Sequence, residues 1–78
     1  MDIDNLIHMA NRIGQFFEAF PDKAEARSGI AQHIAKFWEP RMREELLASL
    51  DAGGAASLLP LVREAVLEHR ASLHRKVA

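Results

Sequence analysis

Residues 37–43 read Phe-Trp-Glu-Pro-Arg-Met-Arg, and they decide where one helix ends and the next begins. Proline lacks the backbone N–H that a helix interior uses, yet it is favoured at the first position of a helix. The residue before a proline is pushed away from helical backbone angles. The sequence therefore predicts a helix that ends near Trp38, a break at Glu39, and a new helix that begins at Pro40.

The same stretch holds our main candidates for partner binding. Trp38 is the only tryptophan, and two arginines, Arg41 and Arg43, follow it closely. Trp and Arg are the residue types that most often anchor interfaces. Arginine in a first helical turn is not favoured for stability, because the helix N-terminus already carries partial positive charge. We therefore predict a docking or anion-binding corner here; in the alternative, Trp38 is a core residue and both arginines are solvated.

Working outward, hydrophobic periodicity predicts four helices and no strand. Alanine is plentiful, while valine and threonine are scarce, which also favours helices. In the first helix Gly14 lies on the apolar face, where it would allow a close helix–helix approach. In the second helix the buried face would hold Ile30, Ile34, Phe37 and Trp38. The expected helices are about 3–19, 22–38, 40–50 and 60–74, followed by a frayed C-terminal tail.

These elements predict one all-α domain over residues 1–78. Asp51-Ala-Gly-Gly gives a stop signal after the third helix, and the loops are short, which favours antiparallel neighbours. We expect a small four-helix bundle-like domain whose third helix is the shortest. A domain of this size buries a limited share of its surface, so a partner could supply part of its stability.

Composition and charge exclude several classes of protein. The chain has 78 residues, no cysteine and a formal net charge of −1. Disulfides, a zinc–thiolate site and a cysteine nucleophile are therefore excluded. The acidic N-terminus is followed by no long apolar run, so we expect no signal peptide, no membrane contact and a cytoplasmic location. A clear basic footprint is missing, so we expect no nucleic-acid partner.

No group of residues suggests catalysis or metal binding. The four histidines are spread over three predicted helices, and none pairs at the spacing of three or four that a helical metal site needs. The serines lie outside any nucleophile motif, and Glu44 and Glu45 are adjacent, so they point apart on a helix. We therefore expect no catalytic, metal-binding or cofactor-binding residue in this chain.

Three segments carry a resemblance to a known family. They are residues 9–17, Met-Ala-Asn-Arg-Ile-Gly-Gln-Phe-Phe, residues 29–43, Gly-Ile-Ala-Gln-His-Ile-Ala-Lys-Phe-Trp-Glu-Pro-Arg-Met-Arg, and residues 61–65, Leu-Val-Arg-Glu-Ala. Over roughly residues 4–68 the sequence resembles the delta subunit of NAD-dependent formate dehydrogenase, a molybdenum- or tungsten-containing enzyme. One departure from the family pattern is Leu59 before Pro60, where a capping serine often stands.

The resemblance implies a non-catalytic accessory subunit that supports assembly or stability of a cytoplasmic complex. Its partners would be the larger subunits, above all the catalytic one. Those subunits would hold the bis-molybdopterin guanine dinucleotide, the iron–sulfur clusters, FMN and the NAD site, while this chain would bind no cofactor.

Two other functions stay open. A maturation factor would assist insertion of the molybdenum cofactor, with Arg41 and Arg43 contacting its phosphates. A helix-turn-helix DNA-binding protein is a remote third possibility, because the second and third helices meet at a short turn. For the accessory subunit we predict partner-binding roles for Trp38, Arg41 and Arg43. Phe16 and Phe20 would add an exposed apolar patch, through which the isolated chain could also self-associate.

Overall fold

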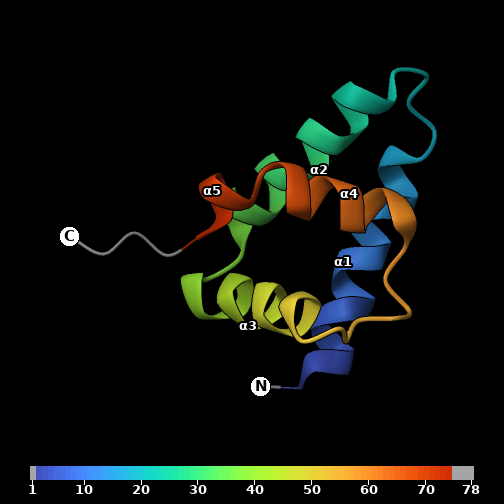
Figure 1. Ribbon diagram of the computed structural model, residues 1–78. Helices are drawn as coiled ribbons and strands as arrows, with labels where there is room; N and C mark the ends of the chain where they lie inside the picture. Colours follow the sequence, from blue (N-terminus) through green and yellow to red (C-terminus); the bar gives the residue numbers. More distant parts are fainter. Residues whose placement is uncertain (1, 75–78) are drawn as a thin grey trace.

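Helices form most of residues 2–74, which are the residues described in this computed structural model (Figure 1). The order is α1 (Ile3–Phe17), α2 (Lys23–Phe37), α3 (Pro40–Asp51), α4 (Pro60–Glu68) and α5 (Arg70–Leu73). No strand occurs among the described residues, so the predicted all-α class is confirmed. The expected frayed tail at residues 75–78 lies outside them.

Local signals in the sequence account for the helix boundaries. The Asp2 carboxylate accepts a hydrogen bond from the Asp4 backbone N–H at 3.0 Å, which caps α1. The Asp22 carboxylate accepts from two backbone N–H groups at the start of α2, at 2.9 and 3.2 Å. Both α3 and α4 begin with proline. Gly53 follows α3 with a φ of 79°, the left-handed conformation of a helix stop, as predicted.

The predicted last helix, 60–74, is two helices rather than one. Because α4 has 9 residues and α5 has 4, α3 with 12 residues is not the shortest helix, and that prediction is wrong. The chain turns at His69, where φ is −104° and ψ is 24°. This turn lets α5 pack on α2 and α3. There Arg70 pairs with Asp51 of α3, and that hydrogen bond is the main cause that raises the pKa of Arg70 above its ordinary value. Contacts with distant residues therefore override a helical periodicity that continues through His69.

One apolar core lies between the helices. Figure 1 shows α3 and α4 lying across the length of α1, and both contact it. The approach of α4 to α1 depends on Gly14, because a Cβ built there would lie 2.3 Å from Val62 Cγ2. The predicted role of Gly14 is thus confirmed. The core residues are Leu6, Ile7, Ala10, Ile30, Ile34, Trp38, Leu46, Leu47, Ala55, Leu58, Val62, Ala65, Val66 and Leu73.

The predicted burial of Phe37 is wrong. Its side chain is 65% exposed, whereas that of the next residue, Trp38, is buried. Trp38 follows Ile34 by one helical turn, and its backbone N–H still bonds to the Ile34 carbonyl, so the indole lies on the buried side of α2. Phe37 follows the exposed His33 by one turn, and its ring packs on that imidazole at the surface.

Candidate partner-binding surface

The structure gives Trp38 a place in the core. Its side chain is 6% exposed and belongs to the same buried cluster as Ile34, Leu46 and Leu73. The indole therefore packs between the end of α2 and the helices that follow. A partner could touch it only if this corner of the fold opened.

Arg43 is also used inside the chain. Its guanidinium donates hydrogen bonds to three carbonyl oxygens: that of Trp38 at 2.8 Å, that of Leu73 at 3.0 Å and that of Ala35 at 3.3 Å. Two of these carbonyls lie at the C-terminal end of α2, where helix carbonyls have no partner within the helix. Arg43 thus ties the ends of α2 and α5 to the start of α3, and these bonds engage the guanidinium that phosphate binding would need.

Arg41 has a different environment. It is exposed, and it makes no hydrogen bond or ion pair with any of residues 2–74. Of the three side chains that we predicted at this corner, it alone is fully exposed, since Trp38 is buried and Arg43 is half-buried. The structure therefore separates the predicted corner into two internal residues and one exposed cation.

A second surface, between α1 and α2, gathers the exposed aromatic side chains. It is a groove of about 470 Å³ lined by Arg12, Ile13, Phe16, Phe17 and His33, and we call it the aromatic groove. Phe16 is 68% exposed, as we expected of it. Its ring meets that of Phe17 edge to face, with 5.1 Å between the centroids. The floor is fixed because Phe17 lies on Gly29, where a Cβ would come within 2.4 Å of the ring.

Two neighbouring rings extend the aromatic groove at its edges. Phe20 is partly buried, with its ring centroid 4.9 Å from that of Phe17. On the α2 side, Phe37 packs against His33 with centroids 4.7 Å apart, and Lys36 lies 5.6 Å above the Phe37 ring. We had selected Phe16 and Phe20 from the sequence but not His33 or Phe37. The i, i+4 spacing of His33 and Phe37 was the available signal.

Two cations lie at the aromatic groove: Arg12 in its lining, and Lys36 over the neighbouring Phe37 ring. Arg12 and Lys36 make no hydrogen bond or ion pair through their side chains within residues 2–74. No carboxylate is among the groove-lining residues. The groove thus combines exposed rings with cations whose charge is not neutralised by a neighbour.

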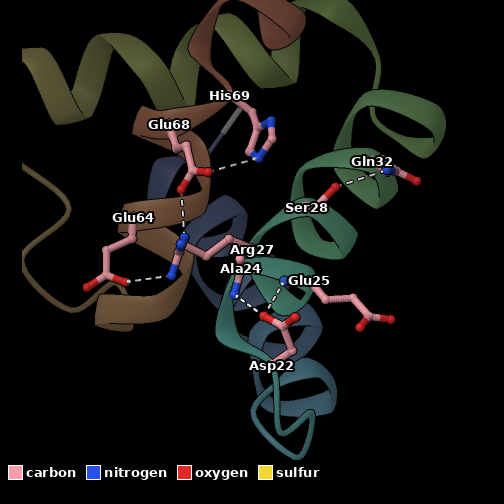
Figure 2. A network of polar contacts seen from close by, with 9 residues as sticks. All are labelled: Asp22, Ala24, Glu25, Arg27, Ser28, Gln32, Glu64, Glu68 and His69. Atoms are coloured by element: carbon pink, nitrogen blue, oxygen red, sulfur yellow. Dashed lines mark hydrogen bonds and ion pairs between the residues drawn. The ribbon is translucent and has the colours of Figure 1, made fainter.

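Polar contacts elsewhere hold helices together. Arg27 of α2 lies 2.6 Å from Glu68 and 4.0 Å from Glu64, both on α4. Figure 2 shows its guanidinium reaching toward both carboxylates. Glu68 also lies 3.7 Å from His69 Nε2, which is buried and has no hydrogen bond. This cluster joins α2 to α4 and holds a single histidine. Within residues 2–74 no group of three or more His, Cys, Asp or Glu side chains is placed to hold a metal ion.

No helix within residues 2–74 has the length and apolar character needed to span a membrane.

Comparison with known families gives one result that identifies the family of this chain. The family model for the delta subunit of NADH-dependent formate dehydrogenase, FdsD, matches residues 5–66. The chain belongs to this family. No curated protein and no solved structure gives a match to it.

Membership of the FdsD family confirms the resemblance that was based mainly on residues 9–17 and 29–43. In the structure these two segments lie in α1 and in α2 and the start of α3. They contribute all five residues that line the aromatic groove. The part of the FdsD chain with the most exposed aromatic surface is therefore formed by the same two segments.

Proposed function

We propose that this chain is a non-catalytic accessory subunit of a cytoplasmic NAD-dependent formate dehydrogenase, and that it supports assembly or stability of the complex. Membership of the FdsD family supports the choice of formate dehydrogenase as the enzyme to which this subunit belongs. The observation that carries the accessory role is the aromatic groove, where Phe16 and Phe37 are 68% and 65% exposed. Neighbouring aromatic rings exposed to water are unfavourable in a free protein. They are typical of a surface that a partner covers.

In this proposal Phe16, Phe20 and Arg41 contact a larger subunit directly, the catalytic one foremost. Trp38 and Arg43 act from inside, because they hold the α2–α3 corner that presents Arg41. A bound subunit stabilises the folded enzyme by mass action, since it binds the native state and not the unfolded one. The molybdenum or tungsten cofactor, iron–sulfur clusters, FMN and NAD site belong to the larger subunits.

The test is copurification of the tagged chain from its native host. An accessory subunit is expected at a fixed ratio to the larger subunits in enzyme that contains its metal and is active. If the tagged chain recovers only metal-free catalytic subunit, it is a maturation factor and the proposed function is wrong. If no formate dehydrogenase subunit is recovered, the proposal also fails, and salt-sensitive duplex binding would then indicate the DNA-binding alternative.

A further inference from the structure

We propose that the aromatic groove receives an apolar segment of a larger formate dehydrogenase subunit in which carboxylates flank the apolar residues. A large apolar side chain of that segment enters between Phe16 and His33, and the carboxylates pair with Arg12 and Lys36. This inference rests on the proposed function and adds to it the site of docking and the chemistry of the partner.

The apolar part of the inference follows from the groove itself. Ile13, Phe16 and Phe17 come from α1, and His33 faces them from α2. The volume of about 470 Å³ is large enough for more than one apolar side chain. A groove between two helices is a common seat for an amphipathic segment, whose anchors recur at intervals of three or four residues. Covering Phe16 and Phe37 would remove the largest exposed apolar side chains of the described chain from water.

The charge of the groove decides which apolar segment fits. Arg12 is one of its lining residues and has no partner within residues 2–74. A neutral or basic segment laid over the groove would strip water from this guanidinium without replacing the lost hydrogen bonds, which is unfavourable. Carboxylates at the edge of the segment would accept charge-assisted hydrogen bonds from Arg12. They would also pair with Lys36, which lies over the neighbouring Phe37 ring.

The same charges argue against a second copy of this chain as the occupant. A two-fold interface brings a surface against itself, so residues of one kind meet in pairs or close to one another. Two aromatic grooves facing each other would place two Arg12 and two Lys36 side chains in one interface. Like charges brought together in this way oppose association. Carboxylates on a different chain would instead pair with these cations.

Photo-crosslinking in the host tests where the partner lies. A photoreactive phenylalanine analogue would replace Phe16 or Phe37 in the tagged chain, and Ala48, exposed in α3, would serve as the control position. We expect positions 16 and 37 to crosslink to one segment of a larger formate dehydrogenase subunit, rich in large apolar residues and containing Asp or Glu within one helical turn of them. Position 48 should give no such product.

Affinity measurements test the chemistry. The dissociation constant would be measured for purified chain and for enzyme from a host that lacks the chain. Phe16→Ser is expected to weaken binding by about tenfold or more, as for an interface anchor. Leu67→Ser is the matched control, because Leu67 is 46% exposed on α4 and lies outside the groove lining. Its effect should stay within about twofold, as for an interface-remote surface residue.

Charge variants complete the set. Arg12→Glu should weaken binding, Arg12→Lys should retain most of it, and the difference between them should shrink at high salt, where exposed charges are screened. Arg12 is exposed, so circular dichroism should report an unchanged helical fold for all variants.

Several outcomes would overturn the inference while leaving the proposed function standing. They are normal copurification and affinity in Phe16→Ser and Arg12→Glu, crosslinks from position 48 only, crosslinks to a second copy of this chain, or a captured segment without carboxylates. Loss of copurification by the unmodified chain would instead remove the proposed function itself.

Discussion

Arg43 donates a hydrogen bond from Nη1 to the Trp38 carbonyl oxygen at 2.8 Å, so two residues on either side of a helix break are joined within the fold. The bond spans Glu39 and Pro40, which belong to no hydrogen-bonded turn of α2. It gives a partner to a carbonyl that the helix leaves without one. The angle between α2 and α3 therefore depends on a side chain as well as on the proline.

Replacing Arg43 should unfold the protein more readily. Arg43→Ala removes hydrogen bonds to three carbonyl oxygens and leaves those at the end of α2 unsatisfied, so we expect a loss of about 3 kcal/mol in the free energy of unfolding. Urea denaturation followed by circular dichroism measures it. Arg41→Ala is the control, and its effect should be below about 0.5 kcal/mol because the residue is exposed. Equal effects of both variants would contradict the bonding described for Arg43.

Gly14→Ala should be destabilising, although alanine is usually the better helix former. A Cβ at residue 14 would lie 2.3 Å from Val62 Cγ2, so α1 and α4 must move apart or Val62 must shift. We expect a cost of about 1–3 kcal/mol, which is typical of overpacking. Thermal unfolding of Gly14→Ala, Val62→Ala and the double variant provides the measurement. The double variant should be more stable than the sum of the two losses predicts, and simple additivity would argue against the contact.

Asn11 should hold the loop between α3 and α4. Its side-chain nitrogen donates to the Ser57 carbonyl at 3.0 Å, and its oxygen accepts from the Leu59 backbone N–H at 2.8 Å. Asn11→Ala removes both bonds and should cost about 2 kcal/mol. Asn11→Asp keeps the acceptor but loses the donor, so hydrogen exchange at the Leu59 amide should rise less than in Asn11→Ala. Unchanged exchange at Leu59 in the alanine variant would show that this bond does not hold the loop.

The contact of Arg27 with Glu68 should contribute a small, salt-dependent coupling between α2 and α4. The two side chains are 25% and 47% exposed and lie 2.6 Å apart, so a double-mutant cycle with alanine should give about 0.5–1 kcal/mol. The cycle of Arg27 with Glu64 serves as the reference, because that distance is 4.0 Å and its coupling should be near zero. A coupling that does not fall with added salt would contradict the ionic character of the contact.

Short-range signals made most of the fold predictable. The prolines at residues 40 and 60 and the glycines after Asp51 each act within a few residues, and each marked a boundary correctly. The division at His69 was not predictable. It depends on Arg70 meeting Asp51 and on Arg43 meeting Leu73, and such pairs form only after the helices have packed.

The candidate surface was predictable only in part, because it too depends on how the helices pack. The exposure of Phe16 follows from its position on α1, but the opposite wall of the groove requires the register between α1 and α2. The i, i+4 spacing of His33 and Phe37 indicates a ring pair on α2, but only that register shows that His33 lies across the groove from Phe16. Trp38 shows the reverse case. Its residue type suggested an interface anchor, while its position one helical turn after Ile34 places it on the buried side of α2.

Leu73 completes the core with 1% of its surface exposed, and its carbonyl binds a side chain 30 residues earlier in the chain. A growing chain leaves the ribosome with its N-terminus first, at about 5–20 residues per second. While residue 73 is still inside the exit tunnel, α1 to α4 lack one of the side chains that fill their shared interior. Native packing of this shared interior therefore forms only after synthesis has passed this residue.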